Sequence, residues 1–180
     1  MGLPRIGNLT SVPALDQPDL MGAPVYAALQ DWSYASEVGV AEIDPDLADT
    51  AALTEAYALP LDASANCVVV AGRRSGEERI AACVVRADTR ADVNNLVKRL
   101  LDVRKATFLS VERAVEETGM EYGGITPVGL PEQWRLLVDS SILSFPVTII
   151  GSGVRRSKLL LEGKLLEHLP RAEVVDSLGT

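Results

Sequence analysis

The sequence is poor in the side chains that most often carry catalysis, with one histidine and two cysteines in 180 residues. Cys67 and Cys83 lie far apart in apolar surroundings, unlike the close-set pairs that hold zinc or undergo redox chemistry, so we interpret them as buried free thiols. His168 has no assignable nucleophile or partner nearby, which favours a structural role. These shortages argue against Ser-His-Asp or Cys-His catalysis and against a metal site, and we expect no cofactor.

The sequence also lacks an excess of positive charge and a long apolar run. Seventeen Lys and Arg face 25 Asp and Glu, giving a formal net charge of −8, so any contact with nucleic acid must be a local patch. No segment approaches the ~18 to 20 consecutive apolar residues of a membrane span, and no basic region followed by an apolar run opens the chain. We therefore expect a cytoplasmic protein that binds neither DNA nor membranes.

What is present fits one ordinary folded domain, because 47% of the residues are apolar and 23% are charged. The proline-rich stretch at residues 1–22 predicts a loosely attached arm, and residues 23–180 predict a single α/β domain. Helices are expected near 25–32, 47–58, 91–101, 110–119 and 165–168. Strands are expected near 38–43, 67–71, 79–86, 135–138, 147–150 and 158–161, with a polar turn at 72–77.

Two glycine-bearing loops, at residues 123–129 and 151–156, are the least ordinary parts of the chain. Neither has the Lys-Ser/Thr of a P-loop or the third glycine of a dinucleotide fingerprint. Taken alone, each loop is more typical of a turn than of a site. Such loops can nevertheless present backbone N–H groups to a carbonyl or phosphate oxygen, which is an anion-binding arrangement that needs no histidine.

The order of several short motifs resembles the YbaK and prolyl-tRNA-synthetase-associated editing domain family, whose members hydrolyse mischarged aminoacyl-tRNAs. The resemblance rests on the segments at 49–53, 67–70, 91–101, 116–119, 123–129, 137–139 and 151–153. It implies an α/β fold in which helices pack on a mixed, strongly curved β-sheet. It also implies a cleft for the terminal adenosine of tRNA and its attached amino acid.

The same resemblance implies a set of site residues. The catalytic group would comprise Asn66, Gly124, Thr126 and Pro127, and the substrate-binding group Gly129, Gly151, Ser152, Gly153 and Arg155. Asn66 occupies the position of the family's lysine, and an amide supplies only neutral hydrogen bonds. Losing one charge-stabilising donor can lower a rate on the order of 10²- to 10³-fold. The basic residues that could restore a positive charge from another direction are Arg73, Arg74, Lys105, Arg155 and Lys158.

Three functions are consistent with these observations. The first is a trans-editing aminoacyl-tRNA deacylase that binds the acceptor end and hydrolyses the ester of mischarged tRNA. The second is a catalytically impaired binding module for an aminoacyl-nucleotide or the tRNA 3′ end, which the replacement of lysine by Asn66 suggests. The third is a structural or interaction domain. Two basic groups, at residues 98–105 and 155–158, could provide a small footprint near the acceptor end.

Overall fold

Two β-sheets form the body of the protein in the computed structural model, which describes residues 2–180. The first sheet has the order β1-β2-β8-β7 and is antiparallel throughout. The second has the order β5-β3-β4-β6-β9 and is mixed, because β6 pairs in parallel with both β4 and β9. The α/β class and the mixed pairing are confirmed, although the strands divide between two sheets that do not close into a barrel.

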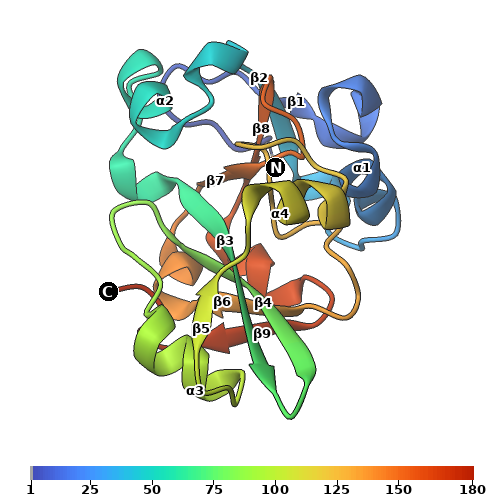
Figure 1. Ribbon diagram of the computed structural model, residues 1–180. Helices are drawn as coiled ribbons and strands as arrows, with labels where there is room; N and C mark the ends of the chain where they lie inside the picture. Colours follow the sequence, from blue (N-terminus) through green and yellow to red (C-terminus); the bar gives the residue numbers. More distant parts are fainter. Residues whose placement is uncertain (1) are drawn as a thin grey trace.

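The strands lie close to their predicted positions, apart from β1 and β9 at the two ends and the short edge strand β5. Their bounds are β1 Val12–Pro13, β2 Gly39–Glu42, β3 Ala65–Arg74, β4 Glu77–Arg86, β5 Ala106–Phe108, β6 Arg135–Asp139, β7 Thr148–Gly151, β8 Ser157–Leu161 and β9 Ala172–Val175. The α-helices are α1 Ala23–Gln30, α2 Thr50–Ala56, α3 Lys98–Leu100 and α4 Val111–Thr118. Figure 1 places the first sheet with α1 and α2 at one end of the molecule, and α3 with the tip of the β3–β4 hairpin at the other.

The β3–β4 hairpin is longer and its turn tighter than the sequence predicts. The two strands pair from Ala65↔Arg86 to Arg74↔Glu77, which leaves only Ser75 and Gly76 in the turn. Both residues have positive φ, 52° and 82°, as a two-residue turn that follows the twist of the strands requires. The expected six-residue turn is therefore wrong, because residues 72–74 continue the strand.

Local signals placed α4 correctly but misplaced the start of the helical segment near residue 93. Ser110 Oγ accepts a hydrogen bond from the Arg113 backbone N–H at 3.3 Å, and Gly119 ends α4 with a φ of 68°. The other segment begins at residue 93 instead of residue 91, with a π-helical turn at 93–97 that is capped by Asp92.

The N-terminal segment is packed onto the body, in contrast to the loosely attached arm that its prolines suggest. β1 pairs with β2, and Ala14 and Met21 are buried in the main apolar cluster beside α1. Gly22 donates a backbone hydrogen bond to the Ser152 carbonyl at 2.9 Å. Apolar burial and main-chain pairing thus hold this segment against the second glycine-bearing loop.

The two sheets meet at a point that positions the candidate site. Ser64, just before β3, forms a parallel bridge with Ile149 of β7. In the adjoining hairpin Gly151 of β7 lies opposite Lys158 of β8. The beginning of β3, the end of β7 and the beginning of β8 therefore converge beside the N-terminus of α2.

Candidate functional site

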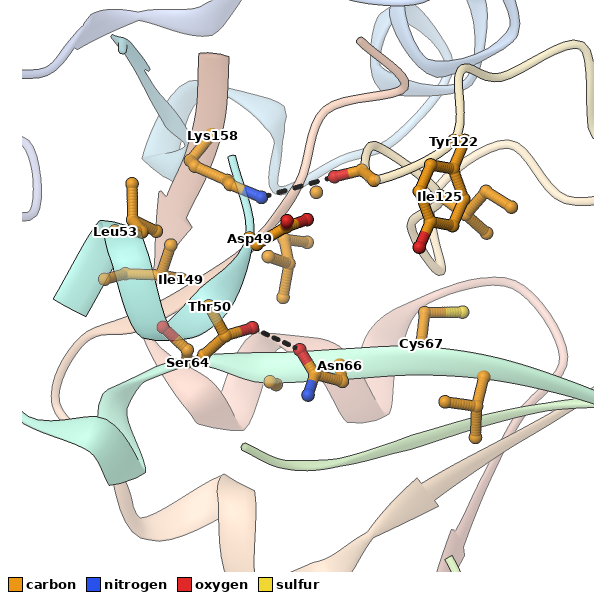
Figure 2. Close-up of a pocket in the computed structure, with 15 residues that line it drawn as sticks. Asp49, Thr50, Leu53, Ser64, Asn66, Cys67, Tyr122, Ile125, Ile149 and Lys158 are labelled. Atoms are coloured by element: carbon orange, nitrogen blue, oxygen red, sulfur yellow. Dashed lines mark hydrogen bonds between the residues drawn. The ribbon is translucent and has the colours of Figure 1, made fainter. Parts of the chain in front are cut away.

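A hollow of about 350 Å³ opens where the two sheets meet. The start of α2, the start of β3, the loop at 122–125 and the β7–β8 hairpin form its walls. Figure 2 shows Thr50 and Asn66 on one side of this cleft and Lys158 and Tyr122 on the other. Of the residues predicted for the site, Asn66 and Gly151 line the cleft directly.

The two glycine-bearing loops converge as predicted and touch through their backbones. Gly153 N–H donates to the Gly124 carbonyl at 2.7 Å, and Glu121 N–H donates to the Gly153 carbonyl at 2.9 Å. A Cβ at Gly151 would lie 2.6 Å from the Gly124 oxygen, and one at Gly124 would lie 2.7 Å from the Val154 nitrogen. Side chains are excluded from these positions because the main chains already approach to contact distance.

Lys158 brings an amine into this cleft from β8. Its side chain is only 8% exposed, and its Nζ donates to the Gly123 carbonyl at 3.4 Å (Figure 2). Burial lowers the pKa of Lys158 to about 8, an effect that Arg155 reinforces and Asp49 opposes. An ammonium group carries three donors, and the long bond to Gly123 occupies one of them. The amine is therefore available to an oxygen atom of a ligand in the cleft.

The opposite wall carries neutral polar groups. Thr50 Oγ1 donates to Asn66 Oδ1 at 3.1 Å, which fixes the amide at the start of β3 (Figure 2). Ser64 also lines the cleft, and its buried hydroxyl has no hydrogen-bond partner among residues 2–180. A buried hydroxyl without a partner is costly, and a polar ligand would relieve that cost.

Arg155 joins two segments that border the cleft. Its guanidinium donates to the carbonyls of Tyr122 at 3.3 Å and Pro45 at 3.1 Å, and lies 3.9 Å from the Asp49 carboxylate. Its backbone N–H donates to the Glu121 carboxylate at 2.9 Å. Arg155 therefore holds the loop at 122–125 against the segment before α2.

Neither thiol is suited to act as a nucleophile. Cys67 lines the cleft, and burial together with the nearby Cys83 raises the pKa of its thiol far above the ordinary range. Burial also raises the pKa of Cys83 to about 12. Since the thiolate is the reactive form, both groups are inert near neutral pH. Both are free thiols, as predicted, but only Cys83 is buried, whereas Cys67 is half-buried.

Several predicted site residues lie behind or beside the cleft. Thr126 and Ser152 are fully buried, and Ser152 Oγ donates to backbone carbonyls at 3.1 Å, including that of Ser157. Pro127 and Gly129 line a separate hollow of about 280 Å³. The loop at 123–129 thus contributes to two cavities, with its first residues in the cleft and its last residues in the second hollow.

Three polar residues that line the cleft, Thr50, Ser64 and Tyr122, are not among the site residues that the sequence predicts. Lys158 was one of five basic candidates, and its distinguishing signal is a charge at the head of an otherwise apolar strand. His168 lies outside the cleft, where its ring stacks on Tyr34 with centroids 4.7 Å apart. Residues 2–180 contain no group of three or more His, Cys, Asp or Glu arranged to hold a metal ion. None of their helices is both long and apolar enough to span a membrane.

Comparison with known proteins gives one family and a consistent fold. The family model for the aminoacyl-tRNA editing domain matches residues 44–169. No curated protein sequence gives a significant match. Among solved structures, the chain is similar to a candidate trans-editing enzyme for prolyl-tRNA synthetase, with a TM-score of 0.73, 21% identity and coverage of 86% of this chain and 94% of that one. It is also similar to a hypothetical protein, with a TM-score of 0.69, 21% identity and coverage of 78% and 90%.

Proposed function

The chain belongs to the aminoacyl-tRNA editing domain family, and we propose that it hydrolyses the ester linking an amino acid to the 3′ end of tRNA. The likeness to a candidate trans-editing enzyme supports action as a separate protein on aminoacyl-tRNA. The observation that carries the proposal is the buried amine of Lys158, which faces the glycine loops inside a cleft. An ester carbonyl is a ligand that such an amine can polarise.

In the proposed reaction, water attacks the ester carbonyl carbon and the bond to the ribose oxygen breaks. One proton from the water goes to the ribose oxygen, and the amino acid leaves as a carboxylate after losing the other proton to solvent. The ammonium group of Lys158 stabilises the negative charge that develops on the carbonyl oxygen. A pKa of about 8 leaves most of this amine protonated at neutral pH. The ester is already activated, so stabilising this charge and positioning water can suffice without a histidine base.

The remaining polar groups of the cleft would position the substrate. Asn66, fixed by Thr50, and the unpartnered hydroxyl of Ser64 would hydrogen-bond the terminal nucleotide. Gly151 and Ile149 would bound the space for the amino acid side chain. In this arrangement the amine that the family carries at the start of β3 is supplied from β8, across the same cleft.

A second candidate function is binding without turnover. It is favoured by the neutral amide of Asn66, which is already engaged by Thr50. A module of this kind would hold an aminoacyl-nucleotide or a tRNA 3′ end in the same cleft but leave the ester intact.

A panel of mischarged tRNAs separates the two functions. We expect deacylation of at least one substrate to exceed its spontaneous hydrolysis by 10²-fold or more, on the order of what a positioned charge-stabilising donor provides. Lys158→Met should remove this activity. Lys164→Met should keep it, because Lys164 is exposed and pairs with Glu162 outside the cleft.

Hydrolysis at the spontaneous rate for every substrate would contradict the enzymatic proposal. Binding of a non-hydrolysable amide analogue of 3′-aminoacyl-adenosine under those conditions would establish the binding module instead. A circular dichroism melt of each variant confirms that the protein is folded when its activity is measured.

A further inference from the structure

A second positively charged region lies at the far end of β3, away from the cleft. Two adjoining hollows, of about 520 and 360 Å³, share Arg73 and Arg104 in their linings. Lys105 and Phe108 line the larger hollow, and Arg74 lines the smaller. We call the surface formed by Arg73, Arg74, Arg104, Lys105 and Phe108 the hairpin patch.

The charge of the hairpin patch is opposite to that of the whole chain. Basic side chains outnumber acidic ones five to one among the residues that line the two hollows, whereas the chain has a net charge of −8. The single acidic residue, Glu78, is engaged by Arg113 through two hydrogen bonds of 2.9 Å. Hydrogen bonding to Arg113 lowers the pKa of Glu78, so the carboxylate stays ionised and paired.

The cations that remain are available to a partner. Arg73, Arg104 and Lys105 are exposed and form no ion pair within residues 2–180. Arg74 is paired with Asp102 at 2.7 Å, which Arg79 also approaches. Three free cations around concave surfaces form a favourable site for the phosphates of a nucleic acid backbone.

An exposed aromatic ring adds a second kind of contact. Phe108 is 64% exposed at the edge strand β5, although the chain has only two phenylalanines and few aromatic residues in all. Aromatic rings beside cationic side chains are typical of surfaces that bind single-stranded nucleic acid, where bases stack on the ring and the charges contact the backbone. An acidic protein segment would use the charges but would gain little from the ring.

The hairpin patch and the cleft lie toward opposite ends of β3. Alternate residues of a strand face the same side, so Cys67 in the cleft shares a face with Ala71 and Arg73 in the patch. At roughly 3.3 Å per residue, Asn66 and Arg73 lie about 23 Å apart along the strand. An RNA with its 3′ end in the cleft would have to extend about this distance along β3 to reach the patch.

We propose that the hairpin patch binds the phosphate backbone and an unstacked base of tRNA upstream of the 3′ end held in the cleft. The identity of the RNA rests on the proposed function, whereas the capacity to bind its backbone rests on the charges and the ring. The chain then binds tRNA at two places along β3. The cleft holds the terminal aminoacyl-nucleotide, and the hairpin patch binds a more distant segment of the RNA.

The test compares two double charge reversals that change the net charge equally. Arg73→Glu/Arg104→Glu alters the patch, and Arg5→Glu/Arg90→Glu alters exposed arginines elsewhere. The dissociation constant for uncharged tRNA, measured by fluorescence anisotropy, should rise on the order of tenfold or more in the first and stay within about twofold in the second. The slope of log affinity plotted against log salt concentration should become shallower by about one to two in the first variant alone.

The aromatic contact has its own variant. Phe108→Ala should weaken tRNA binding about tenfold and leave the salt dependence unchanged, because stacking releases no counterions. If the charge reversals disturb folding, Arg104→Ala/Lys105→Ala removes the charges without adding acidic groups and should weaken binding in the same direction.

Equal tRNA affinity of the two double reversals would overturn the proposal. Loss of polyglutamate binding in the patch variant, with its tRNA binding unchanged, would also overturn it and would assign the patch to an acidic protein. These measurements use uncharged tRNA, so they read out the patch even if no aminoacyl-tRNA is hydrolysed. Conversely, hydrolysis of 3′-aminoacyl-adenosine, which is too short to reach the patch, should proceed at the same rate in both double variants.

Discussion

The protein has two positively charged regions that differ in their exposure to water. Lys158 is buried in the cleft, and its pKa falls to about 8 because the charged form is poorly solvated there. The arginines of the hairpin patch are exposed, and guanidinium groups remain charged at all physiological pH values. In the proposed roles, the buried amine would act over a short range on one atom, whereas the exposed arginines would attract phosphates over a longer range that salt can screen.

The largest expected effect separates these two roles directly. Lys158→Met should lower the single-turnover rate of deacylation on the order of 10²- to 10³-fold, because it removes the charge that stabilises the developing oxyanion. The affinity for uncharged tRNA should change less than about threefold, since the exposed arginines are untouched. A loss of tRNA binding as large as the loss of rate would break the distinction between the two regions.

The free energy of unfolding should depend on pH because the amine of Lys158 is buried. The folded pKa of Lys158 lies below its unfolded value of 10.5, so the unfolded chain binds more protons between about pH 8 and 10.5. Lys158 should therefore lower the free energy of unfolding below pH 8, on the order of 3 kcal/mol. This loss of stability should disappear as the pH rises from 8 to 10.5.

Urea denaturation of the wild type and Lys158→Met across this pH range isolates the contribution, since the other titrating groups are common to both proteins. A difference between the two stabilities that does not vary with pH would indicate that the amine is well solvated, contrary to its burial.

A smaller effect is expected in the pH dependence of the rate. If the protonated amine is the active form, deacylation above the spontaneous rate should fall about tenfold between the plateau and pH 9, with a midpoint near 8. Lys158→Arg should retain activity and extend the plateau to higher pH, because the guanidinium stays protonated. A rate that rises through pH 8 would instead assign the neutral amine the role of a base.

The smallest effect concerns the single histidine. His168→Ala should change the deacylation rate less than twofold, because the ring stacks on Tyr34 outside the cleft. A loss of about 0.5–1.5 kcal/mol in the free energy of unfolding is expected from the lost stacking. A tenfold fall in rate without a change in stability would show that the side chain takes part in the reaction.

Much of the fold could be predicted because it depends on local patterns. The β-branched run before residue 71 predicts β3, and Ser110 with Gly119 marks both ends of α4. Ser75 at positive φ gives little signal in the sequence, so the length of the hairpin was underestimated. The packing of the first 22 residues depends on contacts with distant elements, which prolines and composition do not reveal.

The candidate site could be predicted only in part, for a related reason. The convergence of the loops around Gly124 and Gly151 follows from a resemblance of motif order, and the structure brings them together. The position of Lys158 depends on its register opposite Gly151, which no local pattern specifies. Pro127 is only a few residues from Gly123, yet it lines another cavity, and Thr126 between them is buried.

The backbone contact between the two glycine loops limits how this cleft can diversify. Gly124 and Gly151 accept no side chain without displacing main-chain atoms, so this backbone contact beside the cleft cannot vary by ordinary substitution. For the proposed substrate, adaptation to a different amino acid would therefore come from other residues that line the cleft, such as Leu53, Tyr122 and Ile149. Homologues that discriminate between substrates would be expected to differ at those positions and to share the two glycines.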